Sequence, residues 1–328
     1  MPDDPRLRAL REFAARASNV RPAPVLDRAA GEALTALDAA GVAALLLKGP
    51  VLAQRLYREG EHRGYLDIDL LVDPQQLERT HAVLRGLGYD NAKTNYAGVD
   101  DFLGVLHAQS WVSLTGCGID LHWRLVGCDL PPPAAWRLLH DSRQTIAVGG
   151  CTVSALGDDA LALHVATHAA QSGPDDAKAI GDLARALERW PIERWRAAAH
   201  LAEALLATEA FAAGLRLSTA GAAMAAELGL PEDGELSWVI RHRPSRPRGT
   251  FHVRGLIDAP GWAARGAILR RSLLPKRAWI ADQTPWARRG GAWLLAAYAL
   301  HMARAPLWAL RAWRFDRRAR RAGRSRER

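Results

Sequence analysis

Cysteine is scarce in this sequence of 328 residues. Its three cysteines, Cys117, Cys128 and Cys151, are odd in number and widely spaced, so they fit neither a disulfide framework nor a zinc-ligand pattern. An apolar signal core is also lacking at the N-terminus, where Asp3 and Asp4 lie among arginines. Both absences favour a reducing, cytoplasmic compartment.

Long uninterrupted apolar runs are missing as well. The nearest approach is residues 292–313, which His301, Arg304, Pro306 and Arg311 interrupt, so no segment is expected to cross a membrane. With 49% hydrophobic and 24% charged residues, the composition is that of a globular protein, and the length allows two domains.

Acidic residues are rare in the last quarter of the chain. Residues 241–328 contain 22 Lys and Arg against 4 Asp and Glu, a net charge of +18, whereas residues 1–240 carry a net charge of −9. This asymmetry predicts that the C-terminal part contacts an anionic partner, such as nucleic acid, a phosphorylated substrate or a membrane surface. The alternative is a composition that simply favours arginine.

Two aspartates, Asp67 and Asp69, interrupt an apolar segment that predicts a buried strand. Its alternating apolar residues are Leu66, Ile68, Leu70 and Val72. On a strand, Asp67 and Asp69 would share one face, where neighbouring carboxylates repel and are costly to desolvate. A divalent cation between them would remove that repulsion, and carboxylate oxygens suit Mg²⁺. The alternative is a strand that starts at the surface with both aspartates solvated.

A third aspartate, Asp120, lies 51 residues after Asp69 in the second arm of a predicted β-hairpin over residues 111–125. On a neighbouring strand it would complete a two-Mg²⁺ site for in-line displacement on a nucleotide phosphate. Asp120 is also a candidate general base toward an acceptor hydroxyl. His122 should point to the same face and is a candidate contact to substrate.

A glycine turn precedes these strands. Lys48-Gly49-Pro50 ends the apolar run 42–47 and opens a predicted helix over residues 51–58. Glycine lets the backbone approach a phosphate, a helix N-terminus favours an anion, and Lys48 adds a positive charge. The alternative is a plain turn.

The order of predicted elements indicates an α+β protein with a mixed sheet and helices against it. Helices are predicted over 26–40 and 74–87, a second hairpin over 143–156, and then helices over 158–171, 175–189, 192–206 and 209–226. Residues 241–260, which contain prolines and repeated arginines, are predicted to be an exposed loop or crossover. We predict an N-terminal helix and linker over 1–24, a mixed-sheet domain over 25–157, an all-helical domain over 158–315 and a disordered basic tail over 316–328.

Two histidines, His164 and His168, lie four residues apart on one predicted helix, a spacing that can hold zinc. No glutamate follows His164, so the metalloprotease motif is absent. The favoured interpretation is packing of this helix against the sheet, with one histidine near the nucleotide or bonded to a backbone carbonyl. Asp182 is expected to pair with His168 or to lie at the rim of the cleft.

Several motifs resemble the nucleotidyltransferase-like family of bacterial uncharacterised proteins, within the polymerase-beta-type nucleotidyltransferase superfamily. The first are Leu45-Leu46-Leu47-Lys48-Gly49, a helix ending in Leu56-Tyr57, and Arg63-x-x-x-Asp67-Ile68-Asp69-Leu70-Leu71-Val72. The strand of the family's third carboxylate is similar to Ile119-Asp120-Leu121-His122-Trp123, and its next helices are similar to Leu161-x-x-His164-x-x-x-His168 and Asp182-Leu183. The resemblance spans residues 25–190, and the basic C-terminal third is less specific.

The resemblance implies a nucleotidyltransferase domain over residues 25–157, followed by the helical domain. Asp67, Asp69 and Asp120 would hold Mg²⁺, or Mn²⁺ in its place, together with an NTP. Lys48 and Gly49 would take the position of the superfamily's Gly-Ser phosphate turn.

The phosphate turn departs from that pattern. Pro50 stands where serine is usual, and the gap from Gly49 to Asp67 is longer than typical. Lys48 or Arg63 is therefore expected to contact phosphate, with His122 as a further nucleotide contact.

The predicted function is Mg²⁺-dependent transfer of a nucleoside monophosphate from an NTP, with ATP expected, to a hydroxyl or phosphate of an acceptor, releasing pyrophosphate. The acceptor is expected to be anionic, such as tRNA or a phosphorylated metabolite, and peptides or proteins are further acceptor classes. One alternative is an inactive nucleotide-binding module. Another is an interaction protein that docks on nucleic acid or membrane through its basic C-terminal part.

Overall fold

The computed structural model describes residues 22–91, 107–113, 115–232, 247, 249–259, 261–275 and 277–324. They belong to two units: residues up to 91 and from 107 to 232 form the first, and residues from 247 to 324 form the second. The predicted N-terminal helix lies outside the described residues.

A mixed sheet forms the centre of the first unit, with the strand order β3-β4-β5-β2-β1-β7-β6. Its strands are β1 Ala44–Leu46, β2 Ile68–Val72, β3 Tyr89–Asp90, β4 Ala108–Ser113, β5 Gly118–His122, β6 Gln144–Val148 and β7 Cys151–Ala155. β2 lies between β5, to which it is parallel, and β1, to which it is antiparallel. The two predicted hairpins are confirmed as β4–β5 and β6–β7.

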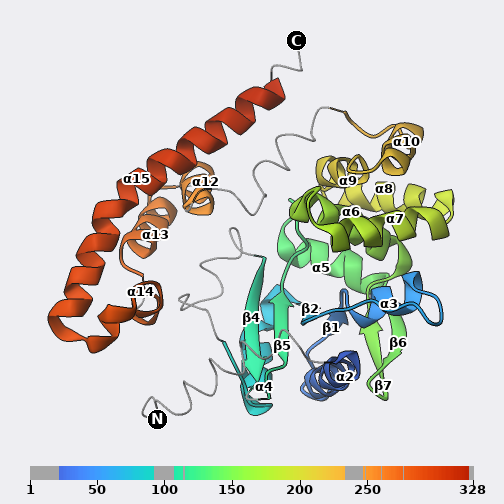
Figure 1. Ribbon diagram of the computed structural model, residues 1–328, viewed down its shortest axis with the longest axis horizontal. Coiled ribbons are helices and arrows are strands. Elements are labelled where there is room, and N and C mark those ends of the chain that lie inside the picture. Colours follow the sequence, from blue (N-terminus) through green and yellow to red (C-terminus); the bar gives the residue numbers. More distant parts are fainter. Residues whose placement is uncertain are drawn as a thin grey trace. The chain divides into compact units, whose positions relative to one another are not determined.

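Helices surround this sheet, and the α+β class is confirmed (Figure 1). Those in the order of the chain are α2 Ala23–Ala39, α3 Pro50–Leu56, the 3-10 helix η2 Pro74–Gln76, α4 Leu77–Gly86, α5 Pro132–Asp141, α6 Asp158–Ser172, α7 Ala177–Arg189, α8 Ile192–Ala204, α9 Thr208–Leu215 and α10 Thr219–Glu227. α2 packs against β1, β6 and β7, and α6 packs against α7, α8 and α9. Every residue of β2 is buried, as expected for a strand with neighbours on both sides.

The predicted helix over residues 209–226 is two helices, α9 and α10. The chain turns before Ser218, whose side-chain oxygen accepts a hydrogen bond from the backbone N–H of Gly221 and so caps α10. Such a cap stabilises a new helix start, which a pattern of apolar spacing does not register. The helical segment predicted as one domain is also divided, since α6 to α10 belong to the first unit and the later helices to the second.

The second unit is helical in the residues described. Its helices are α12 Thr250–Asp258, α13 Trp262–Leu273, α14 Arg277–Gln283, the 3-10 helix η3 Pro285–Arg289 and α15 Gly291–Arg324. α12 occupies part of the segment predicted as a loop. A small core forms around Ile280, Ala287 and Ala297, whereas the side chain of Trp262 is 83% exposed.

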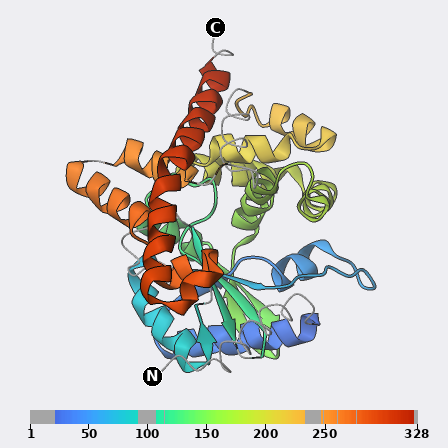
Figure 2. The ribbon, with the colours of Figure 1, turned by 60° about the vertical axis from the view of Figure 1, so that its left-hand side comes forward.

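α15 is the longest helix described, with 34 residues, and is the red rod in Figure 2. It continues through residues 316–324, where we predicted a disordered tail, because arginine and alanine are both strong helix formers. In the part of the chain that the structure describes, no helix is long and apolar enough to cross a membrane.

Candidate active site

Three aspartates lie together on one face of the sheet. Asp69 and Asp120 are register partners on the parallel strands β2 and β5, and register partners point to the same face. Asp67 comes one residue before β2, and its Cβ lies 3.8 Å from the place that a side chain on Gly118 would take. The absence of a side chain at position 118 therefore leaves room beside Asp67.

The predicted strand is shorter than its apolar pattern suggested. Leu66 lies outside β2 and is 49% exposed, whereas Ile68, Leu70 and Val72 are buried. Val72 and Asp69 are three residues apart on β2, so strand alternation turns their side chains to opposite faces of the sheet.

Asp69 is buried, with 4% of its surface exposed, and its Oδ1 has two partners. The ammonium of Lys48 lies 2.9 Å from this oxygen, and Nε2 of His122 lies 3.1 Å from it. Burial alone would raise the pKa of Asp69, but Lys48 and His122 outweigh burial and hold that pKa below its usual range. Asp69 is therefore ionised at pH 7, and the alternative that it is solvated is wrong.

Asp67 has the opposite electrostatic environment. Burial, followed by the negative charges of Asp69 and Asp120, raises the pKa of its carboxyl. Asp120 accepts a hydrogen bond from Ser110 Oγ at 2.6 Å. The three acids thus differ in how far their charge is compensated.

The chemistry of these donors suits Mg²⁺, which prefers hard carboxylate oxygens, and a cation would relieve the repulsion that Asp67 meets. Among the residues described, no three His, Cys, Asp or Glu side chains are arranged to hold a metal ion as they stand. Asp69 is directed to Lys48 and His122 instead. The carboxylates are therefore the type of ligand that Mg²⁺ prefers. To bind the metal, Asp69 would have to release the ammonium of Lys48.

The predicted phosphate turn joins β1 to α3. Gly49 adopts φ +62°, a conformation that L side chains rarely take, and a Cβ there would lie 3.4 Å from the ring of Tyr65. Burial alone would lower the pKa of Lys48, but the charge of Asp69 and those of its two neighbours raise it above the usual value. Lys48 therefore carries its positive charge beside Asp69 at pH 7.

Arg63 is buried and bound by Asp182 of α7. Its Nε donates to Asp182 Oδ1 at 3.0 Å, and its Nη2 donates to Oδ2 at 2.7 Å. Its Nη1 donates to the carbonyl oxygen of Gly49 at 3.4 Å, and Tyr57 donates its hydroxyl to Asp182 at 2.8 Å. Asp182 therefore pairs with Arg63 and Tyr57 rather than with His168. The guanidinium of Arg63 contacts the backbone carbonyl of Gly49 in the turn.

Histidines lie close to the Lys48–Asp69 pair. Burial, and after it the charge of Lys48, lowers the pKa of His164 to about 3 and that of His168 well below its usual value, so both rings are neutral at pH 7. Neither ring nitrogen of His164 has a hydrogen-bond partner among the described residues. The ring of His107 lies 5.6 Å from that of His122.

Some residues of this site were not predicted. Ser110 is the register partner of Asp120 across the β4–β5 hairpin, so aligning the two arms of that hairpin would have found it. His107 stands at the edge of a weakly patterned stretch, and no local signal marks it. Lys178 at the start of α7 is near enough to Asp67 for their charges to interact, which only the tertiary structure reveals.

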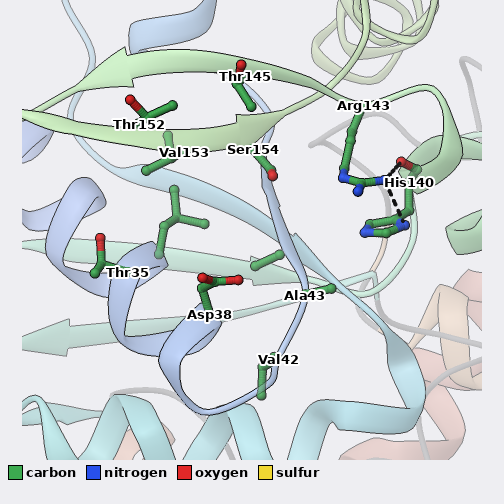
Figure 3. A pocket seen from close by; sticks show the side chains of 12 residues that line it. Thr35, Asp38, Val42, Ala43, His140, Arg143, Thr145, Thr152, Val153 and Ser154 are labelled. Carbon is green, nitrogen blue, oxygen red and sulfur yellow. Dashed lines mark hydrogen bonds between the residues drawn. The ribbon is translucent and has the colours of Figure 1, made fainter.

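A separate pocket of about 300 Å³ lies near the beginning of β1 (Figure 3). Asp38, His140 and Arg143 line it together with the threonines of β6 and β7. None of the aspartates predicted for the active site is among its lining residues. β1 runs from this pocket to Lys48, so the pocket and the aspartates lie at opposite ends of the strand.

Comparison with known proteins identifies one family. The sequence model of a family described as uncharacterised nucleotidyltransferase matches residues 4–220. This range covers two-thirds of the chain and contains the three aspartates of the candidate site, the glycine turn and the Arg63–Asp182 pair. No curated protein matches the chain.

Proposed function

The chain belongs to this family of uncharacterised nucleotidyltransferases, and on that premise we propose that it transfers a nucleoside monophosphate from an NTP, with ATP expected, to an acceptor oxygen. The observation that carries the proposal is the convergence of Asp67, Asp69 and Asp120 on one face of β2 and β5, beside Lys48. Acids with shifted pKa values, as Asp67 and Asp69 have, are typical of catalytic sites.

The aspartates would hold Mg²⁺, or Mn²⁺ in its place. The bound cation would neutralise charge on the triphosphate as the leaving group departs. Lys48 would bind phosphate oxygens, and Gly49 would let the backbone come close to them. His122 would keep Asp69 oriented, and Arg63 would fix the turn through the Gly49 carbonyl.

The transfer forms a bond from the acceptor oxygen to the α-phosphorus and breaks the bond from that phosphorus to the oxygen bridging to the β-phosphate. The electron pair of the broken bond leaves with pyrophosphate. Where the acceptor is a hydroxyl, its proton passes to Asp120, which Ser110 holds in place. A phosphate acceptor already carries an anionic oxygen.

The acceptor is proposed to be anionic, since residues 241–328 carry a net charge of +18. A tRNA or a phosphorylated metabolite has this property. A second candidate function is nucleotide binding without turnover, which the Lys48–Asp69 pair favours because an internal ammonium already neutralises one of the acids.

The test is transfer of label from each α-labelled NTP to components of a cell extract, with pyrophosphate release measured in parallel. Asp67→Asn and Asp120→Asn should each lower turnover by about 10²-fold or more. Asp38→Asn, in the pocket at the other end of β1 (Figure 3), is the matched control and should leave turnover unchanged. Unchanged turnover in both active-site variants would refute the proposal, and nucleotide binding without pyrophosphate release would support the second candidate.

A further inference from the structure

The ammonium of Lys48 occupies the position that a metal cation bound to Asp69 would take. Its ammonium lies 2.9 Å from Asp69 Oδ1, and the two side chains are 17% and 5% exposed. The backbone fixes this proximity, because the N–H of Leu47 donates to the carbonyl oxygen of Asp69 at 3.0 Å. The pairing of β1 with β2 therefore places Lys48 next to Asp69, and the ion pair is not a chance contact of two surface side chains.

Lys48 also interacts with the charges of the two other aspartates. A divalent cation that approached Asp69 while Lys48 stayed there would meet a like charge at close range, in a poorly solvated site. The ammonium cannot leave without cost either, because a largely buried charge that loses its partner is strongly destabilised. A new anion must replace Asp69 as its partner.

A nucleotide triphosphate would provide that anion. Lys48 directly precedes Gly49, and the lysine side chain is a flexible four-carbon stem that carries a compact charge. Rotation about its side-chain bonds can therefore move the ammonium without breaking the sheet. Arg63 cannot do the same, because Asp182 and the Gly49 carbonyl hold its guanidinium.

We propose that Lys48 couples divalent-cation binding to nucleotide binding. This inference rests on the proposed function. In the nucleotide-free protein Lys48 neutralises Asp69 and keeps the affinity for a cation low. When the nucleotide binds, the ammonium passes to a phosphate oxygen, and Asp69 becomes able to hold the cation. Because linkage is reciprocal, the cation must tighten nucleotide binding by the same factor.

Binding of Mn²⁺ to the full chain tests this coupling. Mn²⁺ affinity is measured by electron paramagnetic resonance or calorimetry at pH 8, with and without an NTP analogue that has a methylene group between its α- and β-phosphates. The analogue should tighten Mn²⁺ binding to the unmodified protein by about 5- to 150-fold, the usual range for linked ligands. In Lys48→Met, binding of Mn²⁺ alone should become about tenfold tighter, and the effect of the analogue should largely disappear.

Two further variants control for charge and for folding. Lys178→Met removes a positive charge that interacts with Asp67 at a distance and forms no ion pair with it. The coupling between Mn²⁺ and the analogue should therefore persist in this variant. Lys48→Arg keeps a charge beside Asp69 and should bind Mn²⁺ alone as weakly as the unmodified protein or more weakly. Circular dichroism establishes that each variant is folded, and the arginine variant tests the direction of the effect even where methionine is not tolerated.

The outcomes separate this inference from the proposed function. If Mn²⁺ and the analogue bind together and Asp67→Asn abolishes that binding, but Lys48→Met leaves the affinity for Mn²⁺ alone unchanged, the coupling role of Lys48 is wrong and the function stands. Tighter binding of Mn²⁺ alone by Lys48→Arg would also overturn the inference. If the unmodified protein binds no Mn²⁺ with the analogue, both are overturned.

Discussion

The Arg63–Asp182 pair provides the sharpest test of how the phosphate turn is held. Both side chains are almost fully buried, at 3% and 4% exposed, and the Asp182 carboxylate is joined to Arg63 through both of its oxygens. Asp182→Asn keeps the shape of the side chain but leaves the guanidinium as an uncompensated buried charge. Breaking a buried pair in this way costs about 3–5 kcal/mol, so the unfolding free energy should fall by that amount.

The assay is urea unfolding followed by circular dichroism at pH 7. Glu61→Gln is the comparison, because Glu61 pairs with Arg189 at 2.9 Å on the surface, where solvent screens the charges. The urea midpoint of Glu61→Gln should stay close to that of the unmodified protein. A double variant, Arg63→Met with Asp182→Leu, should be less destabilised than the sum of the two single changes.

The Asp182→Asn change should also affect function. Arg63 donates to the Gly49 carbonyl, so Asp182→Asn should weaken nucleotide binding in the fraction that remains folded, although Lys48 is untouched. A loss of stability below about 1 kcal/mol, the scale of an exposed pair, would refute the view that this buried pair holds the turn.

Two further predictions concern the site itself. Since burial and its acidic neighbours raise the pKa of Asp67, the folded state holds that proton more tightly than the unfolded chain, and Asp67 lowers stability as the pH rises above its unfolded pKa of about 3.9. Asp67→Asn should therefore be more stable than the unmodified protein in urea at pH 7, with a smaller difference at pH 4; an equal or lower stability at pH 7 would contradict this. Gly49→Ala should lose about 1–3 kcal/mol because of its positive φ, whereas Gly64→Ala, which has open space around it, should not; equal losses in thermal unfolding would show that backbone conformation is not the cause.

Local sequence pattern was sufficient where the constraint is local. The period-two alternation of residues 66–72 and the glycine turns of the two hairpins identify β2, β4–β5 and β6–β7, since each signal lies within a few residues. The placement of Asp69 beside Asp120 depends on the register of the parallel strands β2 and β5, which no local pattern specifies. The start of β2 at Ile68 could not be predicted, because Leu66 continues the apolar alternation although it is exposed.

Contacts between segments that are distant in the sequence could not be predicted from local pattern. Arg63 and Asp182 are 119 residues apart in sequence, and nothing near either residue indicates the other. For residues 316–324 we predicted disorder, because the ends of domains are often poorly ordered, whereas the helix propensity of arginine and alanine favours the helix observed there. Ser110 was not predicted either, although the register of the predicted hairpin would have placed it opposite Asp120.

The contrast between two clusters of buried charge separates structural from functional electrostatics in this fold. Asp182 and Arg63 compensate each other, because Arg63 binds both carboxylate oxygens and Tyr57 adds a further donor. Around Asp69 the balance is incomplete: Lys48 and His122 lower the pKa of Asp69, while that of Asp67, two residues away, is raised. A purely structural ion pair gives no reason to keep an uncompensated acid beside it, since such an acid opposes folding at neutral pH. The proposed cation site would use that excess of negative charge, so Asp67, rather than the better-paired Asp69, is the residue that most strongly supports the proposal.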